Sequence, residues 1–375
     1  AMPLSDAERQ HLRQSCSLVV PGMPDRTPAD DFQRLADWCR AHDVAHDRYG
    51  DGPLVQDFET KIATLLGLPA AAFMPSGVMA QLIALRIWTE ARGLPRVGLH
   101  PTSHLLLHED EAWSALLGLH AVPLGQRQRP LLAEDLAACG QPLAAVITEL
   151  PLRESGGRLP SWDELQALKD TARQRGVRLH MDGARLWEST AGFGRPPAEV
   201  AAGFDSVYVS FYKGIGAITG AMLLGDAGFI AQARLWRHRL GGTLYHLSPM
   251  VASAAMQFDE RLALMPALLR RARSLAAALA GLPGLRVDPP EPHVNLMNLW
   301  FDAPIAAVQA ARDTVAQESG VWLFGGFDVA DVPGWCQLEL QVGDSLLAVP
   351  DGQLVPLFQR VCELMRTPSP QSRDA

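Results

Sequence analysis

Two segments of this chain each place a charged residue directly after a predicted β-strand. In LHMDGARLWE, at 179–188, Asp182 follows the β-type run 177–181. In VSFYKGIGA, at 209–217, Lys213 follows the β-type run 206–211. A lysine and an aspartate at two strand ends are a reactive combination, and they limit the chemistry of a chain that carries both.

Chemistry with pyridoxal 5'-phosphate (PLP) requires such a pair. The lysine amine forms a Schiff base with the cofactor aldehyde, and the carboxylate keeps the pyridine nitrogen protonated so that the ring accepts electrons. We therefore predict Lys213 and Asp182 as catalytic and cofactor-binding residues. Taken singly, a lysine after a strand is usually a surface charge, and Asp182 would be a helix N-cap or the ion-pair partner of Arg185.

The neighbours of Lys213 favour the catalytic interpretation. Gly214 and Gly216 permit a sharp backbone turn. Ser210 is near enough to bind a phosphate oxygen and is a candidate cofactor ligand. Apolar residues such as Phe211 would lower the pKa of the amine, which favours its neutral, nucleophilic form.

The turn formed by Ser76, Gly77 and Val78 is the predicted phosphate site. It lies between a predicted strand and a predicted helix, where free backbone N–H groups and the helix dipole favour an anion. Many such turns bind nothing, but this one belongs to the first strand–helix unit and is the best candidate. Arg185 is placed to meet the phenolic oxygen of the cofactor or a substrate carboxylate.

Three histidines, His100, His104 and His108, recur at intervals of four residues. On a helix this spacing would suggest metal ligands, but Pro101 interrupts the segment and no cysteine or further histidine stands nearby at ligand spacing. We therefore predict no metal site. His104 is expected to lie flat on the cofactor ring, with His108 as the second candidate and a purely structural histidine as the alternative.

Short β-type runs alternate with helical stretches through the first two thirds of the chain. The runs lie near 70–74, 96–99, 120–123, 144–149, 177–181, 205–211 and 219–224. This alternation predicts an α/β fold with a mostly parallel sheet and helices on both faces. The proline-rich stretch 288–292 marks a boundary, beyond which we expect a smaller α+β domain. The expected division is an N-terminal arm at 1–30, a large domain at 31–250 and a small domain at 251–375.

The composition excludes several classes of protein. The chain has 375 residues, of which 48% are hydrophobic, enough for two domains with sizeable cores. Its net charge is −8, with no basic stripe for nucleic acid or an anionic membrane, and its apolar runs are too short to span a bilayer. The five cysteines show no C-x-x-C pattern, which is typical of reduced thiols in a cytoplasmic protein.

Taken together, these residues resemble the threonine aldolase/β-eliminating lyase family of fold type I PLP-dependent enzymes. The matching segments stand in the family's order at 49–67, 73–85, 104–110, 179–188 and 210–217. The resemblance implies a transferase-like α/β fold, with a large domain on a mostly parallel, seven-stranded sheet and a smaller C-terminal α+β domain. It also implies the cofactor roles given above to Lys213, Asp182, His104 and the Ser76–Gly77 turn.

The resemblance implies an activity and a quaternary structure as well. Members of the family split β-hydroxy-α-amino acids into glycine and an aldehyde. They are usually dimers or tetramers with active sites at subunit interfaces. We therefore expect a PLP-dependent carbon–carbon lyase, an aldehyde-lyase, that acts on threonine, allo-threonine or a similar small amino acid. We expect it to be a homodimer or homotetramer.

Three segments depart from the family pattern, and all three concern the substrate. No counterpart of the family's N-terminal Arg-Ser-Asp-Thr precedes Tyr49, and the strand at 335–341 carries no arginine. Members have Glu-Asn-Thr-His-Asn-Gly where this chain has Glu149-Leu-Pro-Leu-Arg153-Glu154, so the histidine near the substrate hydroxyl is missing. We expect Arg153 or Glu154 to help position the base that takes the hydroxyl proton.

Arg153, Glu154 and Arg185 are thus candidate substrate-binding residues, and Arg237 is a fourth. Arg237 stands in ARLWRHRLGG, at 233–242, a basic cluster before two glycines. Such a cluster is typical of a solvated helix face that ends at a glycine. It would also suit the binding of a phosphate or a carboxylate across a subunit interface.

Three other functions stay open at this point. The same cofactor supports β-elimination or another reaction at the α-carbon of a different amino acid. A nicotinamide-dependent oxidoreductase would need a G-x-G-x-x-G after its first strand, and the turn at 75–78 does not supply one. A binding or regulatory protein would not need to keep both Lys213 and Asp182.

Overall fold

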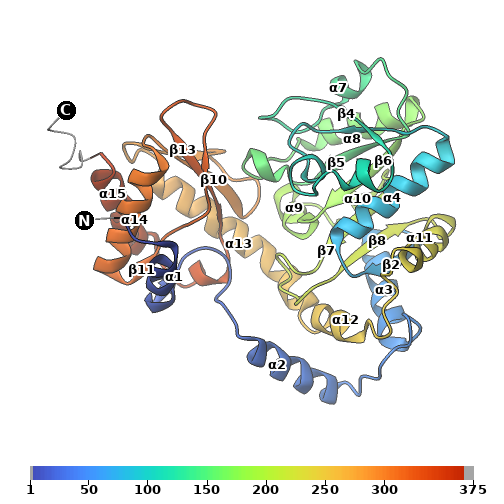
Figure 1. Ribbon diagram of the computed structural model, residues 1–375, viewed down its shortest axis with the longest axis horizontal. Coiled ribbons are helices and arrows are strands. Elements are labelled where there is room, and N and C mark those ends of the chain that lie inside the picture. The colour runs from blue at the N-terminus through green and yellow to red at the C-terminus, as the bar shows by residue number, and fades with distance from the viewer. Residues whose placement is uncertain (1–2, 367–375) are drawn as a thin grey trace. The chain divides into compact units, whose positions relative to one another are not determined.

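The computed structural model describes residues 3–366, which form two compact units (Figure 1). The larger unit is Arg26–Met265, and the smaller combines residues 3–25 with residues 266–366. The long helix α13, Phe258–Leu279, contributes residues to both. The domain limits expected from the sequence, 1–30, 31–250 and 251–375, stay a prediction.

A seven-stranded sheet forms the centre of the larger unit, in the order β2-β8-β7-β6-β5-β3-β4. Five neighbouring strands, β4, β3, β5, β6 and β7, pair in parallel. Strand β8 is antiparallel to both of its neighbours, β7 and β2. The strands are β2 (Ala70–Met74), β3 (Arg96–Leu99), β4 (His120–Pro123), β5 (Ala145–Glu149), β6 (Arg178–Gly183), β7 (Ser206–Ser210) and β8 (Ala221–Gly225). The predicted, mostly parallel sheet is confirmed, and each expected β-type run overlaps a strand.

Helices cover both faces of this sheet. On one face, α4 (Gly77–Arg92) and α11 (Ala227–Arg239) pack against apolar side chains of the strands. On the other face, α3 (Pro53–Leu66) and α9 (Leu186–Phe193) meet the start of α13. The aromatic rings that pack against one another there, some stacked and some edge-to-face, are Phe58, Phe73, Trp187, Phe211 and Phe258. The further helices of this unit are α2 (Pro28–Ala41), α5 (His104–Leu107), α6 (Ala112–Ala115), α7 (Ala133–Ala137), α8 (Trp162–Gln174), α10 (Pro197–Ala201) and α12 (Ser248–Ala255).

Local sequence determines where α4 begins and ends. Ser76 is the N-cap, and its Oγ accepts a hydrogen bond from the backbone N–H of Met79 at 3.2 Å. The helix is buried along most of its length, and it stops at Gly93, whose φ of 62° is a left-handed value that glycine adopts freely. In the first turn of this helix, Gly77 lies close to Tyr208 of β7.

The smaller unit is α+β, as expected. Its four-stranded sheet is antiparallel, in the order β12-β13-β10-β9. The strands are β9 (Leu285–Asp288), β10 (Leu296–Phe301), β12 (Phe327–Val329) and β13 (Cys336–Gln341), with a separate parallel pair of β1 (Leu18–Val19) and β11 (Val321–Trp322). Its helices include α1 (Asp6–Ser15), α14 (Ile305–Ser319) and α15 (Asp351–Leu364). Within residues 3–366, no helix combines the length and apolar character that crossing a membrane demands.

Candidate active site

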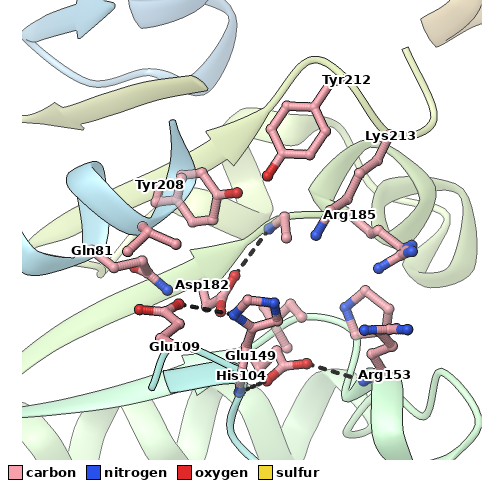
Figure 2. Close-up of a pocket in the computed structure, with 15 residues that line it drawn as sticks. Gln81, His104, Glu109, Glu149, Arg153, Asp182, Arg185, Tyr208, Tyr212 and Lys213 are labelled. Atoms are coloured by element: carbon pink, nitrogen blue, oxygen red, sulfur yellow. Dashed lines mark hydrogen bonds and ion pairs between the residues drawn. The ribbon is translucent and has the colours of Figure 1, made fainter. Parts of the chain in front are cut away.

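Three charged side chains at neighbouring strand ends point into one cavity (Figure 2). Glu149 ends β5 and stands opposite Asp182 of β6 in the parallel register. Lys213 follows β7, which pairs with the other side of β6. Because parallel strands end at the same edge of a sheet, residues far apart in sequence meet there. The polar and charged residues that line the cavity are Gln81, His104, Glu109, Glu149, Arg153, Asp182, Arg185, Tyr208, Tyr212 and Lys213.

Asp182 is buried in this cavity, with 3% of its surface exposed. Its Oδ1 accepts a hydrogen bond from the backbone N–H of Ala184 at 3.2 Å. Burial raises the pKa of the carboxyl group, and the charge of Lys213 opposes that shift. A cationic partner in the cavity, such as a protonated pyridine nitrogen, would therefore stabilise the ionised form of Asp182.

The surroundings of Lys213 favour a neutral amine. Burial and the nearby Arg185 guanidinium lower the pKa of Lys213, while Asp182 opposes them. The chain turns sharply after the lysine, and the backbone N–H of Gly216 donates to the Lys213 carbonyl at 2.9 Å. Gly216 has a φ of 77°, which a residue with a Cβ rarely adopts. The structure thus brings the predicted amine and the predicted acid into one cavity.

Glu149 also lines the cavity, although nothing in its local sequence distinguishes it. Its Oε1 accepts a hydrogen bond from the backbone N–H of Arg153 at 3.2 Å, and its Oε2 accepts one from that of His104 at 3.4 Å. Burial and the charge of Asp182 raise the pKa of Glu149 to about 8. The signal that could have identified it is its position at the end of the run 144–149, since the neighbouring strand carries Asp182.

Replacing Glu149 by glutamine is expected to stabilise the cofactor-free protein, and to do so more at about pH 8 than at about pH 5. The folded-state pKa of about 8 lies above the ordinary 4.5, so the folded protein keeps a proton that the unfolded chain releases. The wild-type protein therefore loses stability as the pH rises from 4.5 to about 8, whereas the variant has no such group. At about 1.4 kcal/mol per pKa unit, the difference reaches a few kcal/mol.

Thermal melting of the two cofactor-free proteins at both pH values measures this difference. The matched control is Glu134→Gln, which removes an exposed glutamate of the same unit. An equal change in melting temperature for Glu149→Gln at both pH values would contradict the expectation.

His104 forms part of the cavity wall and is paired with an acid. Its Nδ1 lies 2.8 Å from Oε1 of Glu109, a buried carboxylate that the sequence pattern did not indicate. The ring of His108 lies beside it, with 5.2 Å between the ring centroids. His108 Nε2 lies 2.6 Å from Oε1 of Glu154. Two histidine–carboxylate pairs therefore stand next to each other.

His100 takes no part in this arrangement. Its Nε2 lies 2.7 Å from the carbonyl oxygen of Gln126 and 2.8 Å from that of Arg129, so it holds a loop in place. Among the residues that the structure describes, no three histidine, cysteine or acidic side chains are grouped so as to hold a metal ion.

The first turn of α4 approaches the cavity closely because residue 77 is a glycine. A Cβ at Gly77 would lie 2.1 Å from Tyr208 Oη, so any larger residue would push the helix or the tyrosine away. Gly77 and Val78 line the cavity, and Ser76 serves as the N-cap. Ser210 is buried at the end of β7 and is not among the described residues that line the cavity.

These residues fit PLP. The cofactor needs an amine for its aldehyde, an acid for its ring nitrogen and an anion site for its phosphate. Lys213 and Asp182 supply the first two, and the first turn of α4, where Gly77 and Val78 line the cavity, supplies the third.

Two of the four predicted substrate-binding residues line the cavity. Arg153 comes from the short 3₁₀ helix η1 (Arg153–Ser155), and Arg185 is the residue that precedes α9. Glu154 is not among the lining residues but pairs with His108. Arg237 lies in a second cavity, where its Nη1 donates to the carbonyl oxygen of Phe73 at 2.6 Å.

The chain matches the family model for β-eliminating lyases over residues 35–301. The chain is also similar to low-specificity L-threonine aldolase 1 of Arabidopsis thaliana. The two are 28% identical over 300 residues, which cover 77% of this chain and 83% of the plant protein.

Two solved structures are similar over nearly the whole chain. One, from Listeria monocytogenes EGD-E, carries the provisional description of an L-allo-threonine aldolase. It has a TM-score of 0.89 and 35% identity, covering 94% of this chain and 98% of that one. The other, from Exiguobacterium sp. 255-15, carries the provisional description of an aromatic amino acid β-eliminating lyase/threonine aldolase. It has a TM-score of 0.88 and 34% identity, covering 94% of this chain and 99% of that one.

Proposed function

Because the chain belongs to the β-eliminating lyase family and is a PLP-dependent lyase of the threonine aldolase type, we propose that it cleaves a β-hydroxy-α-amino acid into glycine and an aldehyde. The observation that carries the proposal is the cavity that Lys213 and Asp182 share, with Arg153 and Arg185 on its wall (Figure 2). An amino-acid substrate brings an amine and a carboxylate, and this cavity offers partners for both.

When bound, PLP supplies an aldehyde that condenses with an amine and a ring that withdraws electrons from the α-carbon of the substrate. We assign Lys213 to hold the aldehyde carbon and Asp182 to pair with the ring nitrogen. The first turn of α4, at Gly77, is assigned to the phosphate, and His104 to one face of the ring. With PLP and substrate bound, the Lys213 amine would be the group that moves a proton at the α-carbon.

Glu149 limits the number of negative charges beside the predicted position of the ring nitrogen. With a pKa raised to about 8 it mostly holds its proton at neutral pH, which leaves Asp182 as the acid that we assign to the ring nitrogen. A second negative charge beside Asp182 would attract a proton away from the ring nitrogen. A protonated Glu149 avoids this competition.

The substrate carboxylate is assigned to Arg153 and Arg185. Both guanidinium groups line the cavity, and two planar forks suit a carboxylate well. The hydrogen bond from the backbone N–H of Arg153 to Glu149 fixes the start of η1 at the cavity. Strand β13, at Cys336–Gln341, carries no arginine that would do the same work.

We also propose a homodimer or homotetramer in the cytoplasm, with active sites at the subunit interface. Tyr49 and Tyr245 form an exposed edge-to-face pair, 57% and 51% exposed, near the cavity that holds Arg237. Exposed aromatic residues of this kind are typical of a protein–protein interface. A second subunit that packed against Tyr49 and Tyr245 would also face the cavity that holds Arg237. The five cysteines are free thiols, which suits a reducing compartment.

Two measurements test the proposed activity. The purified protein is expected to be yellow, or to become so on addition of PLP, and to lose the colour on treatment with borohydride. It is expected to release glycine and an aldehyde from threonine, allo-threonine or phenylserine. Ammonia and a keto acid from a cysteine-type substrate, without glycine from any of the three, would instead indicate β-elimination. A protein that gains no visible band with PLP would contradict the cofactor assignment.

A further inference from the structure

A cleavage of this type needs a base, because the β-hydroxyl group must lose its proton as the aldehyde forms. We propose that His108, held in place by Glu154, is that base. The inference rests on the proposed function, since a reaction without a β-hydroxyl group has no use for such a residue. It assigns a role to the second of the two histidine–carboxylate pairs, His108 Nε2 with Glu154 Oε1 at 2.6 Å.

The two pairs differ in their access to water. The side chains of His104 and Glu109 are 32% and 2% exposed, so the buried carboxylate anchors this pair in the protein, which suits a fixed wall of the cavity. The side chains of His108 and Glu154 are 41% and 31% exposed. A base must pass its proton to solvent in every turnover, and the more exposed pair is able to do so.

The His108–Glu154 pair is flanked on both sides by residues that line the cavity. His104 lies one helical turn before His108, with 5.2 Å between their ring centroids. Arg153 directly precedes Glu154 in η1. Neither His108 nor Glu154 is among the described residues that line the cavity, but their hydrogen bond joins the end of α5 to η1 beside two residues that are.

The position beside Arg153 is the relevant one for a β-hydroxyl group. In a β-hydroxy-α-amino acid, only the α- and β-carbons separate the hydroxyl oxygen from the carboxylate carbon. If Arg153 holds the carboxylate, groups next to Arg153 are near the hydroxyl. Glu154, the residue after Arg153, holds the imidazole of His108 by a hydrogen bond.

The chemistry of the pair follows from its hydrogen bond. The Glu154 carboxylate accepts the N–H of His108 Nε2, which leaves the lone pair on Nδ1. Nδ1 takes the hydroxyl proton, directly or through one water molecule. The electron pair of the O–H bond becomes the second bond of the aldehyde carbonyl, and the pair of the Cα–Cβ bond stays with the α-carbon. The ammonium form of Lys213 gives its proton to that carbon to form glycine and takes one up again from water. His108 releases its proton to water, so no proton is gained or lost overall and nothing is oxidised or reduced.

Two reactions of the PLP-loaded enzyme separate this role from a structural one. The first is aldehyde release from threonine, allo-threonine and phenylserine. The second is exchange of the α-proton of glycine in D₂O, followed by NMR, which needs the cofactor, Lys213 and the carboxylate site but no β-hydroxyl base. His108→Gln is expected to lower kcat for cleavage by about 100-fold or more and to leave glycine exchange within about twofold of wild type.

Three further variants complete the experiment. Glu154→Gln is expected to lower cleavage by about 10-fold, and the double variant should be no slower than His108→Gln alone because the two residues act as a unit. His120→Gln removes an exposed histidine of the same unit and should change neither reaction. His108→Asn replaces His108→Gln if the latter unfolds, as judged by melting temperature and the visible spectrum.

Each outcome decides the question. Loss of cleavage with glycine exchange retained supports the role of His108. Equal loss of both reactions, or cleavage at the wild-type rate in His108→Gln, would overturn it. If the wild-type protein exchanges glycine but cleaves none of the three substrates, the proposed function fails, and the assignment of His108 fails with it.

Discussion

Replacing Lys213 by alanine is expected to abolish the borohydride-sensitive visible band of the PLP-loaded protein and to lower lyase kcat by roughly 10³-fold or more. Lys213 is the amine of the cavity, and burial together with Arg185 lowers its pKa toward the neutral, nucleophilic form. Alanine removes both the group that binds the aldehyde and the group that moves the proton at the α-carbon. The visible spectrum before and after borohydride, and the rate of aldehyde release, measure the effect.

The matched control is Lys61→Ala. Lys61 is 43% exposed and forms an ion pair with Asp259 at 2.7 Å, so its loss should change neither the spectrum nor the rate. A Lys213→Ala protein that still yields a borohydride-sensitive band would show that another amine holds the cofactor.

Replacing Asp182 by asparagine is expected to weaken PLP binding and to lower kcat by about 100-fold, without lowering the melting temperature of the cofactor-free protein. Asparagine keeps the size of the side chain but has no charge to hold a proton on the ring nitrogen, and losing one such electrostatic contact commonly costs this much. Burial raises the pKa of Asp182, so the native site disfavours the charge and its removal costs no folding stability. PLP titration, aldehyde release and thermal melting measure the three effects.

Asp205→Asn serves as the control, because Asp205 lies at the opposite edge of the same sheet. Its Oδ2 accepts the backbone N–H of Leu179 at 2.8 Å, and its Oδ1 pairs with Arg178 at 2.9 Å. This variant should melt at a lower temperature and retain its kcat, the reverse of the pattern for Asp182→Asn. Wild-type kcat in Asp182→Asn would remove Asp182 from the mechanism.

Much of the fold was predictable because buried parallel strands appear in sequence as short apolar runs between helices. The run 205–211, for example, lies over β7 at Ser206–Ser210. The antiparallel direction of β8 was not predictable, since it depends on how the chain returns after Lys213. The pairing of β1 with β11 was equally hidden, because it joins segments from opposite ends of the chain.

The residues of the candidate site likewise fall into those that the sequence predicts and those that only the structure reveals. Lys213, Asp182, His104, Gly77 and Arg185 were predicted from local patterns, and the structure brings them into one cavity. Glu149 and Glu109 were not predicted, because an acid at a strand end or in a loop has no local feature that separates it from a surface acid. Their burial and their partners exist only once β5 lies beside β6 and α5 lies against the sheet.

The sequence by itself determined the cofactor chemistry and the family, because that chemistry needs particular residue types in a fixed order, and residue type and order are what a sequence contains. Only the tertiary structure decided that Glu149 faces Asp182, that His104 pairs with Glu109, and that His108 pairs with Glu154. The physical reason is that a pKa or a proton transfer depends on burial and on distances of a few ångströms. Strand register and loop packing set these, and neither is written in any one segment of the chain.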